Sequence, residues 1–112
     1  MKRRKFGRSD DRLSVLGFGG IVVKDVSQAD ADRLVATAVD RGINYFDVAP
    51  TYGSAEERLG PALEPFRDDA FLACKTTQRH GVEARRELER SLKSLRTEHF
   101  DLYQLHGIAS DE

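Results

Sequence analysis

Apolar residues recur along this chain with two different spacings, and the spacing switches at regular intervals. Short apolar runs, typical of strands, alternate with longer stretches in which apolar side chains return every three or four positions. The short runs predict strands over residues 43–48, 70–76 and 101–106. The longer stretches predict helices starting at Ser27, at Ser54 and near Val82. This alternation indicates parallel strands joined by right-handed helical crossovers.

Each predicted helix has an apolar side and recognisable ends. Ser27 with Asp30 three residues later, and Ser54 with Glu57, have the spacing of helix caps. Pro61 predicts a kink or a short first turn in the second helix. The apolar stripes are Ala31, Leu34, Val35, Ala38 and Val39 in the first helix, and Ala84, Leu88, Leu92 and Leu95 in the third. The many Arg and Glu residues of the third helix are expected on its solvent face.

The amino-terminal segment has a different pattern. Residues 4–16 predict a short hairpin whose polar turn covers residues 7–11. Its second arm continues into the Gly-Phe-Gly-Gly run at 17–20, where glycine lets the backbone pass close to another group. This run is not a dinucleotide-binding fingerprint, because Val22 occupies the position of the last glycine. We therefore expect the first of four parallel strands here, and no Rossmann fold.

Three of the four expected strands end on an ionisable residue, namely Asp47, Lys75 and His106. These residues are 28 and 31 positions apart, close to the spacing of roughly 250 residues over eight units in a (β/α)8 barrel. Side chains alternate between the two faces of a strand. The face expected to line a barrel interior or site carries Tyr45, Asp47, Phe71, Ala73, Lys75, Leu102, Gln104 and His106. The face expected to pack under the helices carries Phe46, Val48, Leu72, Cys74, Tyr103 and Leu105. We therefore predict that the three ionisable side chains converge at the carboxyl ends of adjacent strands.

Tyr52, five residues after Asp47, suggests a chemistry for this end of the sheet. A phenol is a weak acid at neutral pH, but a nearby ammonium favours its phenolate form, and a carboxylate keeps that ammonium charged. Asp47 would thus hold Lys75 charged, and Lys75 would make Tyr52 a better proton donor. His106 could hydrogen-bond the group that receives the proton. Protonation of an oxygen without a protein nucleophile suggests carbonyl reduction with a hydride-donating cofactor. The alternative to a catalytic role is a purely structural one, in which Asp47 only caps the turn that follows the strand.

Several motifs of the chain, in this order and register, resemble the aldo-keto reductases. They are Leu16-Gly-Phe-Gly19 after the hairpin, GINYFDVAPTYG at 42–53, SAEERLG at 54–60, Lys75-Thr76, and DLYQLH at 101–106. The resemblance spans about residues 5–108. It implies an α/β fold of the (β/α)8 TIM-barrel type. Residues 1–112 would form the amino-terminal part of a single barrel domain, with the first four strands and three helices, and the hairpin would close its amino-terminal end.

The same resemblance implies NADPH-dependent interconversion of carbonyl compounds and alcohols, with a small carbonyl compound as substrate. The four residues that match the family's catalytic tetrad are Asp47, Tyr52, Lys75 and His106, with Tyr52 as the general acid. The residues expected near the nicotinamide end of the cofactor are Gly19, Gly20, Ile21 and Asp47. Many family members have a polar residue in place of Gly20, so contact there would come from the backbone.

Four strands are half of a barrel, and in the family most contacts to the pyrophosphate and adenine come from the other half. The chain is therefore interpreted as part of a reductase that is inactive by itself. The alternative is a non-catalytic truncated fragment, or a binding or regulatory one, on the same scaffold. A third interpretation is a half-barrel that self-associates with a second copy through its open sheet edges.

The amino-acid composition limits the kinds of binding partner and the cellular compartment that we expect for this protein. The net charge is −1 and acidic and basic residues are interspersed, so nothing indicates a nucleic-acid partner. No stretch approaches the roughly 18 apolar residues of a membrane span. The single cysteine, Cys74, excludes an internal disulfide framework and favours a cytoplasmic location and a core role. His80 and His99 are expected at the surface, and no motif indicates a metal site.

Overall fold

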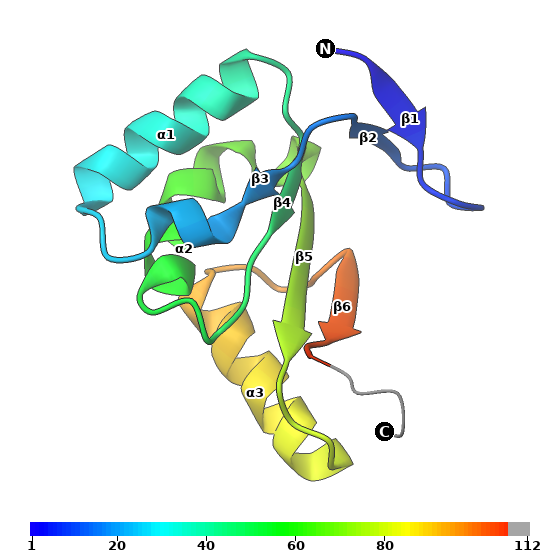
Figure 1. Cartoon of the computed structure of the whole chain (residues 1–112), viewed down its shortest axis with the longest axis vertical. Helices are drawn as coiled ribbons and strands as arrows, with labels where there is room; N and C mark the ends of the chain where they lie inside the picture. The colour runs from blue at the N-terminus through cyan, green and yellow to red at the C-terminus, as the bar shows by residue number, and fades with distance from the viewer. Residues whose placement is uncertain (108–112) are drawn as a thin grey trace.

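In a computed structural model, which describes residues 1–107, the chain is arranged around a four-stranded parallel sheet (Figure 1). Its strands follow chain order and are β3 (Phe18–Gly19), β4 (Tyr45–Asp47), β5 (Phe71–Thr76) and β6 (Leu102–Leu105). The connecting helices are α1 (Gln28–Asp40), α2 (Ala55–Leu63) and α3 (Gly81–Ser94). An antiparallel hairpin of β1 (Arg3–Lys5) and β2 (Arg12–Ser14) precedes them. The predicted order of hairpin and βα units is confirmed.

The core lies between the sheet and its helices. Phe46, Val48, Leu72 and Cys74 are fully buried there, together with residues from each of the three α-helices or their ends. Side-chain alternation along β4 and β5 is therefore as predicted. Leu105 on β6 is the exception, because 52% of its surface is exposed.

The apolar stripes of α1 and α3 differ from the prediction. On α1 the buried residues are Ala31, Val35 and Ala38, whereas Leu34 is 44% exposed beside an apolar groove. On α3 the buried residues are Glu87 and Ser91, followed by Leu95 just beyond the helix, while the predicted Leu88 and Leu92 are half-buried. The reason on α3 is that Glu87 bonds the polar groups at the end of β5.

Serine forms the predicted cap at one helix but not at the next. Ser27 Oγ accepts a hydrogen bond of 3.1 Å from the Asp30 amide, so the first cap is confirmed. Ser54 stands at the N-cap position of α2, but the expected cap hydrogen bond is absent. Its hydroxyl instead accepts a bond of 3.0 Å from the Asp25 amide. Ser54 therefore joins two loops, and the capping prediction for it is wrong. Pro61 lies inside α2, which ends two residues later and continues as the 3-10 helix η2 (Glu64–Asp69).

Gly20, which opens the 3-10 helix η1 (Gly20–Val23), shows why glycine is needed after β3. A Cβ atom at this position would lie 2.8 Å from the Asp47 carbonyl oxygen and 2.9 Å from Val48 Cβ. Any larger residue would push η1 away from the end of β4. The predicted close approach of the backbone is confirmed here, and it brings η1 against the strand end that carries Asp47.

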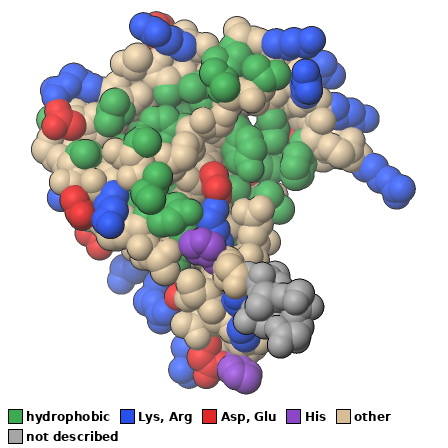
Figure 2. All heavy atoms as spheres, viewed as in Figure 1, with side chains coloured by type: hydrophobic (Ala, Val, Ile, Leu, Met, Phe, Trp, Pro, Cys, Tyr) green, Lys and Arg blue, Asp and Glu red, His purple; other side chains and the backbone are tan. Residues whose placement is uncertain are grey.

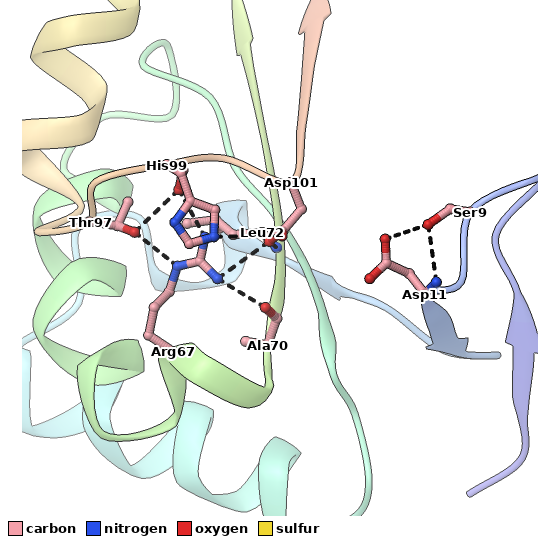
Figure 3. A network of polar contacts seen from close by, with 8 residues as sticks. All are labelled: Ser9, Asp11, Arg67, Ala70, Leu72, Thr97, His99 and Asp101. Carbon is pink, nitrogen blue, oxygen red and sulfur yellow. Dashed lines mark hydrogen bonds and ion pairs between the residues drawn. The ribbon is translucent and has the colours of Figure 1, made fainter.

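The amino-terminal end of the sheet is closed by the hairpin and by an arginine. The Phe6 ring packs against that of Phe71, the first residue of β5, with 5.3 Å between centres. Arg67 donates hydrogen bonds to the carbonyl oxygens of Ala70 and His99 and pairs with Asp101 at 3.3 Å (Figure 3). These contacts fix the starts of β5 and β6 and cover the amino-terminal end of the sheet. The opposite, carboxyl end of the strands is therefore the end available for a binding site.

Both edges of the sheet are unpaired within residues 1–107. There β3 pairs only with β4, and β6 only with β5. Self-association through these edges stays a prediction. None of the helices in the described part of the chain is long and apolar enough to cross a membrane.

Candidate active site

The four residues of the predicted tetrad come from neighbouring elements at one end of the sheet. Asp47 ends β4, Lys75 is the second-last residue of β5, and His106 directly follows β6. Tyr52 lies in the loop between β4 and α2. The register pairs Asp47 with Ala73, so Lys75 stands two positions further along the same face.

Asp47 and Lys75 form a close ion pair. Lys75 Nζ donates to both carboxylate oxygens of Asp47, at 2.6 Å each. The Lys75 side chain is only 10% exposed, whereas that of Asp47 is 36% exposed. An ammonium that is removed from water to this extent requires a compensating charge. The ion pair therefore explains why a lysine can lie on this face of the sheet.

Tyr52 and His106 lie next to this ion pair. Lys75 Nζ is 5.9 Å from the centre of the Tyr52 ring. The rings of Tyr52 and His106 meet edge to face, with 5.9 Å between their centres and 85° between their planes. Acidic, basic and histidine side chains gather at the centre of the face in Figure 2, bordered by hydrophobic ones. The structure thus brings all four side chains together, as the strand spacing predicts for three of them.

His106 has an unsatisfied polar atom in this site. Its Nδ1 is buried and has no hydrogen-bond partner among the described residues. A buried ring nitrogen without a partner is costly unless a ligand or water supplies one. The geometry at His106 therefore suits a site that receives a polar group from a bound molecule.

The residues predicted near a cofactor lie beside Asp47. Gly19 is paired with Asp47 across β3 and β4, and Gly20 contacts its backbone. Within residues 1–107, no atom outside Gly19 and its two chain neighbours lies within 4 Å of a Cβ built on Gly19, so the space over this residue is open. Ile21 is exposed on η1. These observations leave room beside Asp47 for a planar group such as a nicotinamide ring, because the backbone approaches Asp47 without a side chain in the way.

Cys74 lies on the other face of β5 and is fully buried. Burial raises the pKa of its thiol to about 12, and the nearby carboxylate of Glu56 adds to the effect. The thiol is therefore protonated at neutral pH and is a poor nucleophile. The predicted core role for Cys74 is confirmed.

Glu87 is a residue near the site that sequence reasoning missed, because it was grouped with the solvent-facing charges of α3. It is buried and contacts the segment that follows Lys75. A signal was present in the sequence. Glu87, Ser91 and Leu95 recur every four positions, and Ser91 is small enough for close packing of the helix.

Glu56, on α2, provides a pH-dependent test of the buried face. Burial raises the pKa of its carboxyl above the ordinary value of 4.5, and the charges of Glu87 and Glu57 add to this. A raised folded-state pKa contributes stability that is fully present below the unfolded-state pKa and is lost as pH rises through the folded-state value. Glu56→Gln is therefore expected to be more stable than the natural chain at neutral pH, with the difference vanishing in acid below about pH 4.

Denaturant unfolding at several pH values measures this effect. Glu98→Gln is the control, because Glu98 is exposed and is not one of the charges that raise the pKa of Glu56, and it should show no such trend. Equal stability of the Glu56→Gln and natural chains at neutral pH would contradict the prediction.

Known proteins provide an independent comparison. Residues 15–112 match the model of the Aldo/keto reductase family. The uncharacterized oxidoreductase YqkF of Bacillus subtilis (strain 168) is 35% identical over 121 residues, covering 96% of this chain and 39% of YqkF. The aldo-keto reductase YhdN of the same organism is 35% identical, covering 84% and 33%. An NAD(P)H-dependent 6′-deoxychalcone synthase of Glycine max is 33% identical, covering 93% and 35%.

Solved structures agree with this result. The aldo-keto reductase AKR11C1 from Bacillus halodurans, in its holo form, superposes with a TM-score of 0.86 at 34% identity, covering 100% of this chain and 42% of that one. The thermostable aldo-keto reductase Tm1743, in complex with the inhibitor epalrestat, gives a TM-score of 0.88 at 30% identity, covering 100% and 45%.

This chain spans less than half the length of each of these relatives and structures. Its sheet, helices and hairpin correspond to part of a TIM barrel. The family model and the structural likeness together show that the chain belongs to the aldo/keto reductases, a family of oxidoreductases.

Proposed function

We propose that residues 1–112 supply the tetrad of an NADPH-dependent reductase that converts aldehydes or ketones to alcohols. The observation that carries the proposal is the Asp47–Lys75 ion pair beside the Tyr52 ring, with His106 edge-on to the same ring. The proposed activity is that of a complete barrel, meaning a protein in which these residues are joined to the remaining βα units of a (β/α)8 domain.

Each side chain has a role that follows from its contacts. Tyr52 is the proton donor, because its phenol is the acidic group beside the charged Lys75. Lys75 stabilises the negative charge that develops on the phenol oxygen as the proton leaves. Asp47 holds the Lys75 ammonium in place through both carboxylate oxygens. His106, whose Nδ1 has no hydrogen-bond partner within residues 1–107, would orient the carbonyl oxygen through a hydrogen bond.

The cofactor would supply the hydride, and this chain would contact its nicotinamide end. Gly19, Gly20 and Ile21 offer backbone groups and an exposed apolar side chain beside Asp47. The relative from Glycine max is an NAD(P)H-dependent enzyme, which supports a nicotinamide cofactor here. We also propose a cytoplasmic location, which the single buried and unpaired cysteine supports.

Oxidation of NADPH on adding an aldehyde, followed by absorbance and by detection of the alcohol, tests the proposal in a complete barrel. Alcohol formation at the rate of NADPH loss is the expected result. Tight NADPH binding without any turnover of several aldehydes and ketones would favour the alternative, a non-catalytic binding protein on this scaffold.

A further inference from the structure

Glu87, on α3, is a buried carboxylate whose partners are the residues immediately after Lys75. Its Oε1 accepts hydrogen bonds from the Thr76 hydroxyl at 2.8 Å, the Thr77 amide at 2.8 Å and the Thr77 hydroxyl at 3.4 Å. Arg90 lies 3.9 Å from the other carboxylate oxygen and is largely exposed, so it is a loose partner. The loop after β5 is therefore the main partner of Glu87.

The carboxylate is ionised despite its burial. Burial alone would raise the pKa of Glu87, but the hydrogen bonds from the Thr77 amide and the threonine hydroxyls outweigh it, so the pKa is lowered. Hydrogen bonds to a charged acceptor are shorter and stronger than neutral ones. Glu87 therefore holds the loop with a strong set of contacts throughout the neutral pH range.

The loop that Glu87 holds connects two members of the tetrad. Thr76 follows Lys75 directly, and its carbonyl oxygen accepts a hydrogen bond of 2.8 Å from the His106 amide. Arg79, three residues further on, donates to the His106 carbonyl oxygen at 2.7 Å and to the Thr77 carbonyl oxygen at 3.2 Å. Both backbone groups of His106 are thus bonded to the segment that Glu87 fixes to α3.

We propose that Glu87 is a positioning residue, which sets the placement of His106 relative to Lys75 by fixing Thr76 and Thr77. The expected effect of Glu87 on the reaction rate rests on the proposed carbonyl reduction. Its effect on the position of His106 does not. Glu87 lies on the helix side of the sheet, against the loop after β5, and acts on the tetrad through the backbone of Thr76 and Thr77. Since a displacement of about 1 Å in an active site can cost on the order of 10²-fold in rate, a loosened His106 should slow the reaction strongly.

The structural arm of the test uses the 112-residue chain itself and hydrogen–deuterium exchange. In Glu87→Ala the amides of Thr77 and His106 should exchange about ten-fold or more faster, because the Thr77 amide loses its charged acceptor and the Thr76 residue that accepts from the His106 amide is no longer held. Glu89→Ala is the matched control, since Glu89 is an exposed glutamate on the same helix. Unchanged protection of the His106 amide in Glu87→Ala would overturn the proposal.

The kinetic arm uses a complete barrel. Glu87→Ala should lower kcat by on the order of 10²-fold with little change in KM for NADPH, and Glu87→Gln, which keeps one acceptor oxygen, should recover part of the rate. Leu95→Ala destabilises the end of the same helix without touching the loop, so its kcat per folded molecule should stay near that of the natural protein. If Glu87→Ala has natural kcat, the positioning role is refuted. If the natural barrel reduces no carbonyl, the proposed function fails, and the exchange result alone decides whether Glu87 holds His106.

Discussion

Tyr52→Phe is expected to lower the kcat for aldehyde reduction by about 10²–10⁴-fold, the usual contribution of a general acid. The substitution removes only the phenol oxygen. The ring keeps its edge-to-face contact with His106, and the Asp47–Lys75 ion pair keeps both of its hydrogen bonds. NADPH affinity should therefore change little, because no predicted cofactor contact is removed.

Tyr103→Phe is the matched control for this loss. The Tyr103 hydroxyl is on the helix side of the sheet, near the Thr76 side chain, and makes no hydrogen bond of normal geometry with the described residues, so its removal should leave the contacts within the tetrad in place. Steady-state kinetics of both variants in a complete barrel, with NADPH binding followed by fluorescence, makes the comparison. A Tyr52→Phe protein that reduces an aldehyde as fast as Tyr103→Phe would exclude Tyr52 as the proton donor.

Lys75→Met should reduce kcat to a similar extent, by about 10²–10⁴-fold, because it removes the charge that stabilises the phenolate of Tyr52. The substitution also leaves the Asp47 carboxylate without its ammonium partner. Since the Asp47 side chain is 36% exposed, water can hydrate it, and the cost in folding stability should be far below that of a fully buried unpaired charge. The loss of rate should therefore exceed any loss of folded protein.

Lys93→Met is the matched control for Lys75→Met, because it removes a lysine that is not part of the tetrad. Lys93 is exposed in the last turn of α3, away from the tetrad, and its substitution should leave kcat unchanged. Thermal unfolding of both variants checks the stability argument. Full activity in Lys75→Met, or unfolding of the variant under assay conditions, would contradict the assigned role.

The sheet and the convergence of its strand ends could be predicted because they depend on periodicity. Side chains alternate along a strand, so an apolar residue such as Leu72 between two inward-facing neighbours fixes which face is covered by helices. Parallel strands joined by crossovers then bring Asp47 and Lys75 to the same end of the sheet. The position of Tyr52 in a loop has no such periodicity, and its role was inferred from its place five residues after Asp47 and from the family resemblance.

The polar contacts between elements could not be predicted, because they depend on which loops meet in space. Ser54 has the spacing of a cap, yet its hydroxyl bonds Asp25, a residue with φ of 58° in a loop 29 positions earlier. Glu87 is surrounded in the sequence by charged residues that face solvent, yet the end of β5 presents several donors to it. In both cases a local rule was overridden by a donor from another element.

The transfer of deuterium from a labelled nicotinamide tests the central claim most directly. A complete barrel that carries residues 1–112 is incubated with an aldehyde and with NADPH deuterated at the transferable position, and the alcohol is analysed by mass spectrometry. The account predicts an alcohol with deuterium on the former carbonyl carbon, formed by the natural protein and by Tyr103→Phe but nearly absent with Tyr52→Phe. Oxidation of the nucleotide without labelled alcohol, or equal labelling by Tyr52→Phe, would contradict it.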